Sequence, residues 1–167
     1  MKLPRLLVAV PLLVVSLAVA TPAQAATVYT AHLTGASELP QRDTRARGQT
    51  ILSLSADGTE LHYRLIVANI ENVVAAHIHL GTADVNGPVV AFLFSGAEQG
   101  RQSGVIATGT ITADDLTGPL AGQPLSALVE ELDAGATYVN VHTNDFVPPT
   151  NTGPGDFPGG EIRGQID

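Results

Sequence analysis

The sequence predicts an all-β domain, a Greek-key β-sandwich or barrel with one short helical crossover. Two observations favour this class. Apolar and polar residues alternate with a period of two along most of the chain, the pattern of strands that bury one face. Gly, Pro and Asn residues, which favour turns, separate these segments at short intervals. Seven or eight short strands punctuated in this way are typical of sandwiches and barrels.

The first 25 residues predict an export signal. Lys2 and Arg5 form a short basic start, residues 6–20 are almost wholly apolar, and Ala23-Gln24-Ala25 matches a cleavage site. The apolar run is shorter than the roughly 20 residues that a membrane-spanning helix needs. We therefore expect a signal peptide at residues 1–25, cleaved near Ala25, and one domain at residues 26–167. The mature protein is expected to be periplasmic or extracellular and not to bind a membrane.

The strands are expected in the following order. Residues 28–33 form the first, and a loop around Pro40 leads to a hairpin. In the hairpin, residues 50–54 and 61–67 flank Asp57-Gly58, a pair that tolerates the positive φ of a tight turn. Further strands are expected at residues 73–80, 89–94, 105–111, 137–143 and 161–166.

One segment departs from the strand pattern. Leu125, Leu128, Val129 and Leu132 recur at helical spacing, and Gly135 follows them as a stop signal. We expect a crossover helix of about ten residues that covers an open end of the sheet. The stretch from Asn144 to Gly160 is rich in Pro, Gly, Asn and Thr and is too long for a simple turn. Loops of this kind are often functional lids.

The composition excludes several classes of protein. The chain has no cysteine, so it can form neither disulfides nor thiolate metal sites, and any metal must be held by nitrogen and oxygen. Its formal charge is −8; without the expected leader, six arginines face 16 acidic residues, a charge of −10. We therefore expect no nucleic-acid partner, because such partners require a basic face.

The histidine pattern is the clearest chemical signal. In a strand, His77 and His79 point to one face about 7 Å apart, a spacing that suits two ligands of one metal. A second segment repeats the design: Asn140 and His142 share one face, and Val139 and Val141 share the other. If the two strands lie close together, three histidines meet on the side away from the aliphatic core. The 144–160 loop could then fold over them.

Three neutral imidazoles suit copper or zinc, so we expect His77, His79 and His142 as metal ligands with copper or zinc as cofactor. The remaining position could be filled by water or by one of several side chains. These are His32, His62, Glu38, Asp145 and Glu161. The alternative is that the three histidines are partly buried, bond to loop carbonyls and stabilise the fold without metal.

Weaker signals remain open. Asp84-Val85-Asn86-Gly87 is similar to part of a calcium loop but lacks the downstream Glu, so a turn is the preferred interpretation. Oxygen ligands for calcium could also come from Asn144, Asp145, Asn151 and Asp156. The polar residues Glu161, Arg163 and Gln165 alternate on the last strand, where an ion pair or solvent exposure is expected.

Four ordered motifs resemble the CHRD domain, which is named after chordin. They are LTGASELP at 33–40, AHIHLG at 76–81 followed by NGPVV at 86–90, YVNVHT at 138–143 and PGGEIRGQI at 158–166. The resemblance covers about Thr27 to Asp167 and is closest to the single-domain secreted bacterial forms. It implies the family's fold and an extracellular location, but a shared fold does not transfer an activity.

The two histidine strands are also similar to the copper-binding strands of Cu/Zn superoxide dismutase, although this chain lacks that enzyme's disulfide, zinc cluster and guarding arginine. Three functions follow. The leading one is a secreted, non-enzymatic binding module with a copper or zinc site. The alternatives are a copper-dependent redox enzyme of superoxide-dismutase type and a purely structural or adhesive extracellular module. In the last case the partner would be an unidentified protein or surface.

Overall fold

The computed structural model describes residues 26–167, so the expected signal peptide lies outside the described residues. This part of the chain contains six strands and a single α-helix, α1 (Leu125–Asp133). The strands are β1 (Val28–Thr34), β2 (Arg47–Leu54), β3 (Leu61–Leu80), β4 (Val89–Ile111), β5 (Thr137–Thr143) and β6 (Ile162–Gln165). Three short 3₁₀ helices lie at Gly35–Ser37, Ala113–Asp115 and Gly118–Leu120. No helix in residues 26–167 has the length and hydropathy of a membrane span.

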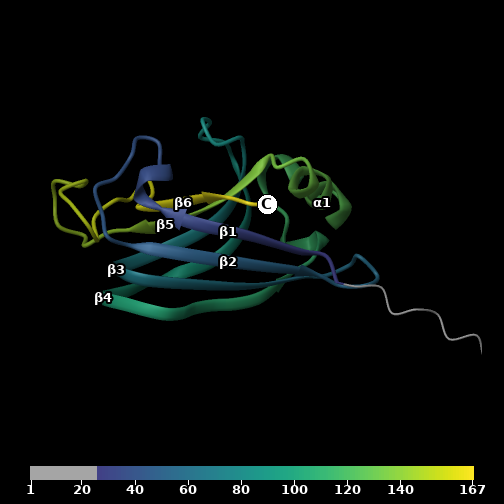
Figure 1. The fold of residues 1–167 in the computed structure, drawn as a ribbon, viewed down its shortest axis with the longest axis horizontal. Helices are drawn as coiled ribbons and strands as arrows, with labels where there is room; N and C mark the ends of the chain where they lie inside the picture. The colour runs from purple at the N-terminus through teal and green to yellow at the C-terminus, as the bar shows by residue number, and fades with distance from the viewer. Residues whose placement is uncertain (1–25) are drawn as a thin grey trace, which may run out of the picture.

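Five strands close into an antiparallel barrel, in the order β1, β2, β3, β5, β6 and back to β1. The sixth strand, β4, pairs with β3 outside this ring, as Figure 1 shows. The predicted all-β, barrel-like fold is therefore confirmed. The chain follows the ring in order except between β3 and β5, where β4 and α1 intervene.

β3 and β4 are each longer than predicted, because two expected short strands join in each. Asn69 and Asn72 in β3 have positive φ values of 56° and 54°, and the register with β4 shifts around them. Asn tolerates this conformation better than most residues, so β3 bends without losing its pairing. Its first part pairs with β2 and its second part with β5, which places residues 73–80 beside the strand that carries His142.

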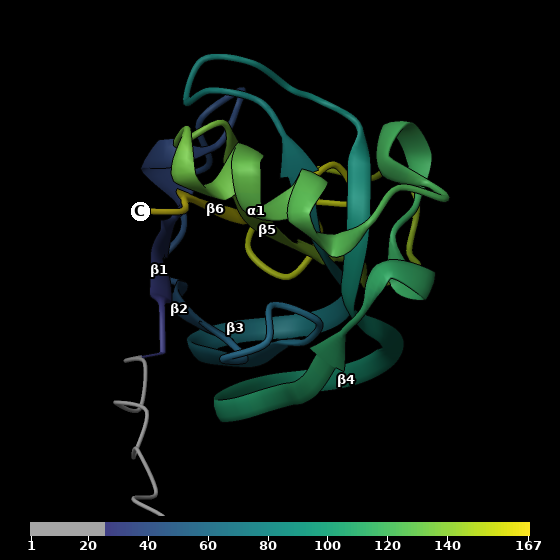
Figure 2. The same cartoon turned by 90° about the vertical axis from the view of Figure 1, so that its right-hand side faces the viewer.

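The aliphatic core fills the barrel and extends under α1. Val139 and Val141 of β5 are fully buried in it, as is Ile78 of β3. The helix buries Leu125, Leu128 and Leu132, the residues whose spacing predicted it. Figure 2 shows α1 lying across one end of the barrel, so the crossover covers an open end as expected.

The last strand departs from its expected exposure. Glu161 and Arg163 are both fully buried, and neither forms an ion pair with any residue in the 26–167 range. Instead Arg163 donates to the loop carbonyls of Thr82 and Val85. Glu161 accepts from two loop residues, Thr44 and Gly155, and from Thr143 of β5. This happens because β6 lies between β1 and β5 under two long connections, so its polar face meets loop backbone rather than water.

Candidate metal centre

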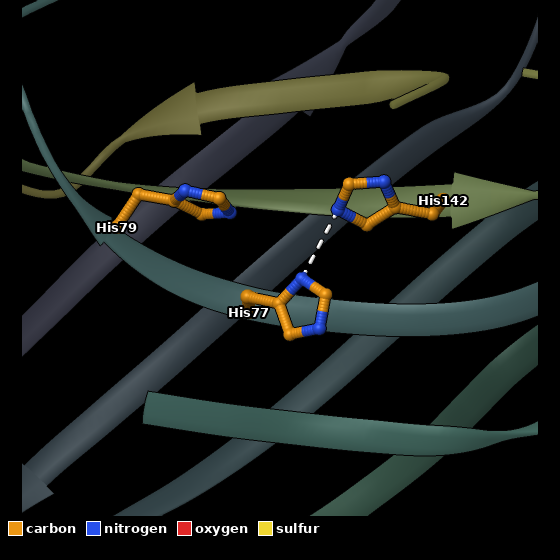
Figure 3. A group of neighbouring side chains, drawn as sticks. All are labelled: His77, His79 and His142. Carbon is orange, nitrogen blue, oxygen red and sulfur yellow. Dashed lines mark hydrogen bonds between the residues drawn. The ribbon is translucent and has the colours of Figure 1, made fainter. Parts of the chain in front are cut away.

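The pairing of β3 with β5 brings the three histidines together. His77 lies opposite Asn140, and Ala75 lies opposite His142, in an antiparallel register. Paired residues and their neighbours two positions away share a face of the sheet, so His77, His79, Asn140 and His142 all project from the same side. Figure 3 shows the three imidazoles turned toward one another from these two strands.

The ring nitrogens are close enough to share one ion after a small adjustment. One nitrogen from each of the three rings lies within 4.8 Å of the others, and His77 Nδ1 is 3.1 Å from His142 Nε2. Nitrogens bound about 2.0–2.1 Å from a common metal can be at most about 4.2 Å apart. A movement of less than about 1 Å therefore converts this arrangement into a three-nitrogen site.

Two loop carbonyls set the protonation of the cluster. His79 Nδ1 donates to Gly87 O at 2.9 Å, and His142 Nδ1 donates to Pro158 O at 2.8 Å. A carbonyl only accepts hydrogen bonds, so in the neutral rings both protons lie on Nδ1 and each Nε2 atom carries a lone pair. Ligating histidines in proteins commonly have such an outer partner, which orients the ring.

Local sequence explains how the first of these loops reaches the site. A Cβ on Gly87 would lie 1.5 Å from Leu80 O, so only glycine permits this close return of the chain. Gly87 N donates to the Tyr138 hydroxyl at 3.1 Å, and the Tyr138 ring stacks on His79 with 4.7 Å between centroids. The Asn-Gly-Pro segment thereby holds His79 between a carbonyl and an aromatic ring.

Burial keeps the imidazoles neutral. Burial, together with the neighbouring His142 and His79, lowers the pKa of His77 to about 4. Burial also lowers the pKa of His79 and of His142, although their bonds to Gly87 and Pro158 partly oppose the shift. Metal binding requires the neutral form of imidazole, and the lowered pKa values mean that the three rings have this form at neutral pH.

Asn140 is a part of this site to which the sequence alone assigned no role. Its Oδ1 lies 2.9 Å from His142 Nε2, and the side chain is 4% exposed. The signal was present in the sequence, because Asn140 alternates with His142 and so shares its face. Phe92 of β4 packs its ring edge-to-face on His77 at 4.7 Å and is itself exposed, so it forms the outer border of the cluster.

The side chains considered for the fourth position lie elsewhere or serve other bonds. Glu161 accepts from Thr44, Thr143 and the Gly155 amide. Asp145 accepts from the Val147 amide within its own loop. The structure places His62 against Thr110 and Glu60, and His32 is exposed on β1. Glu38 is the exception, because it is buried beside Asn140.

The side chains that were considered as oxygen ligands for calcium form hydrogen bonds within turns or between loops instead. Asp84 accepts from the Thr82 hydroxyl, and Asn86 bonds to Leu39 O and Arg163. In the 144–160 loop, Asn144 accepts from the Phe146 amide and Asp156 from Thr152. Within residues 26–167, the three histidines are the only group of three or more His, Cys, Asp or Glu side chains with metal-ligand spacing.

Comparison with protein families agrees with the motifs. The model of the CHRD domain matches residues 29–149, which include all three histidines and Asn140. The motif at 158–166, which carries β6, lies beyond the matched range. Comparisons with curated proteins and with solved structures found no match. Because the match covers most of the chain, this protein belongs to the CHRD domain family.

Proposed function

We propose that this protein is a secreted binding module that holds one copper or zinc ion between His77, His79 and His142. The observation that carries the proposal is the set of lone pairs that converge in the cluster. His79 Nε2 is buried and has no hydrogen-bond partner, and His142 Nε2 lies against the oxygen of Asn140 as well as against His77 Nδ1. A cation can bind several acceptor atoms at once, so it would satisfy the lone pairs of His79, His142 and Asn140 together.

The purely structural alternative accounts for only one of the two ring nitrogens of His79 and of His142. Bonds to Gly87 O and Pro158 O satisfy the Nδ1 atoms of His79 and His142 and would stabilise the loops without metal. Buried polar atoms are nearly always hydrogen-bonded, however, and leaving one unmatched costs about 1–3 kcal/mol. His77 Nδ1 supplies one proton to His142 Nε2, which leaves His79 Nε2 unmatched.

The location and the ion follow from separate arguments. Secretion rests on the leader pattern of residues 1–25 and on the extracellular setting that the resemblance to chordin implies. Copper or zinc rests on the donors, because imidazole suits both ions and the chain has no thiolate to offer. A redox enzyme of superoxide-dismutase type is supported only by the likeness of two strands, so binding is the function proposed.

Metal titration of the exported chain tests the proposal. Metal-free protein at pH 7.5 is titrated with Zn²⁺ and with Cu²⁺ in a calorimeter, and bound metal is counted by elemental analysis. We expect one ion per chain, lost in the triple variant His77→Ala/His79→Ala/His142→Ala and kept in the control His32→Ala/His62→Ala. Failure of the wild-type protein to bind a stoichiometric ion, or equal binding by the triple variant, would overturn the proposal.

A further inference from the structure

The contact between Asn140 and His142 brings two acceptor atoms together without a proton between them. Asn140 Oδ1 is an acceptor, and His142 Nε2 is also an acceptor once Nδ1 donates to Pro158 O. The two atoms are only 2.9 Å apart, a distance at which two lone pairs repel unless a cation lies between them or beside them.

Glu38 determines which end of the amide faces the histidines. Its side chain is 2% exposed, and Oε1 has no hydrogen-bond partner that meets normal geometry. Glu38 Oε1 and Asn140 Nδ2 both border Gly160, where a Cβ would lie 2.3 Å from the first and 3.0 Å from the second. With Nδ2 turned toward a carboxylate, Oδ1 must point toward the imidazoles.

The distances suit two adjacent ligands of one ion. Asn140 Oδ1 and His77 Nδ1 lie 2.9 Å and 3.1 Å from His142 Nε2, so each would form an angle of about 85–95° with it at a metal about 2.1 Å away. Asn140 is also held in place, because its strand pairs with β3 on one side and β6 on the other. The amide oxygen therefore needs no rearrangement to bind.

We propose that Asn140 Oδ1 is the fourth ligand of this site and that Glu38 is the positioning residue that orients its amide. The inference rests on the proposed function. It makes the donor set three nitrogens and one oxygen, which favours a divalent ion, Cu²⁺ or Zn²⁺, over Cu⁺ with its preference for sulfur ligands. It also leaves no water in the place that Asn140 fills.

Pulsed electron paramagnetic resonance of Cu²⁺-loaded protein in D₂O tests the inference directly. Deuterium modulation from a water in the equatorial plane of copper is expected to be absent in the wild-type protein and to appear in Asn140→Leu, where water replaces the lost oxygen. The affinity for Cu²⁺ should fall at least about tenfold in the same variant. Gln165→Leu, which removes an amide from the neighbouring strand, is the matched control and should keep the wild-type spectrum.

Glu38→Gln tests the positioning role with almost no change in volume. A second amide beside Asn140 allows its side chain to turn over, so we expect the water signal to appear in part of the molecules. A merely structural role for Glu38 would lower the unfolding temperature and leave this signal absent.

The outcomes separate the two proposals. A wild-type protein that binds no copper overturns both. A wild-type protein that binds one Cu²⁺ through three imidazoles, but already shows equatorial water, overturns the role of Asn140 and leaves the histidine site standing. This last measurement needs no variant, so it decides the question even if Asn140→Leu does not fold.

Discussion

Two buried polar clusters lie on neighbouring strands, and they complete their bonding in opposite ways. The Arg163 guanidinium donates to Thr82 O and Val85 O at 2.8 Å each and to Asn86 Oδ1 at 3.0 Å. It also stacks on the Tyr138 ring, with its central carbon 3.4 Å from the centroid. This cluster consists of a cation surrounded by the acceptors of one loop.

The histidine cluster, in contrast, gathers acceptor atoms toward one another. Lone pairs of His79, His142 and Asn140 face a common region, and the donors of the first two rings are used on loop carbonyls outside it. The comparison indicates that Arg163 serves the fold, since its bonds close within the chain. The proposed function assigns the histidines to an external ion, since the Nε2 atom of His79 has no partner within the described chain. The following predictions can break or sharpen this distinction.

The largest effect is expected on metal affinity. His79→Ala removes the ligand whose Nε2 has no other partner, so Zn²⁺ affinity should fall by more than about 100-fold, beyond the range seen when only outer contacts are lost. Competition with a chelator of known affinity measures this. A drop smaller than about threefold would show that His79 is not a ligand.

The Arg163 cluster should show the reverse behaviour. Arg163→Met leaves several buried acceptors unmatched, and we expect a loss of about 3 kcal/mol in the free energy of unfolding, measured by urea denaturation. The variant should still bind one Zn²⁺ per chain. If it loses the ion while its unfolding free energy is unchanged, the two clusters do not have separate roles.

Acid should destabilise the metal-free protein through its histidines. The folded-state pKa of His77 is about 4, below the ordinary value of 6.5, so the unfolded state takes up protons first as the pH falls. The contribution of His77 to the free energy of unfolding is therefore fully present above about pH 6.5. It decreases as the pH falls to about 4, by about 1–3 kcal/mol. Urea denaturation across this range gives the curve, and His77→Gln should flatten it; an unchanged slope would contradict the assignment.

The smallest effect is expected from the bond between Tyr29 and Asp133, which belongs to neither cluster. The Tyr29 hydroxyl donates to Asp133 at 2.7 Å, and burial together with this bond raises its pKa to about 12. Tyr29→Phe should lower the free energy of unfolding by about 1 kcal/mol and leave metal affinity unaltered. Ultraviolet titration of the wild-type protein should show one tyrosine ionising near pH 12, and its absence would refute the contact.

The sequence predicts which side chains share a face of a strand, but it does not predict every hydrogen bond that these side chains form. Alternation along a strand is a property of the backbone, so the residue pattern alone places His77 with His79 on one face and Asn140 with His142 on another. The role of Asn140 depends on which way its amide points. That direction is set by Glu38, about 100 residues earlier in the chain, and no local pattern reveals it.

Strand lengths are harder to predict than strand faces. Asn favours turns, so Asn69 and Asn72 predict breaks between short strands, yet their positive φ only bends β3 within continuous pairing. The burial of Glu161 and Arg163 escapes prediction for a related reason. Polar alternation predicts exposure unless loops cover the strand, and the two covering loops are distant or irregular segments.

Anomalous diffraction from crystals of the zinc-loaded protein tests the central claim most directly. We expect one zinc peak about 2.0–2.1 Å from His77, His79 and His142 nitrogens, with their Gly87 and Pro158 bonds intact. A crystal that contains zinc only at surface groups such as Glu60 and His62, or no zinc at all, would contradict it.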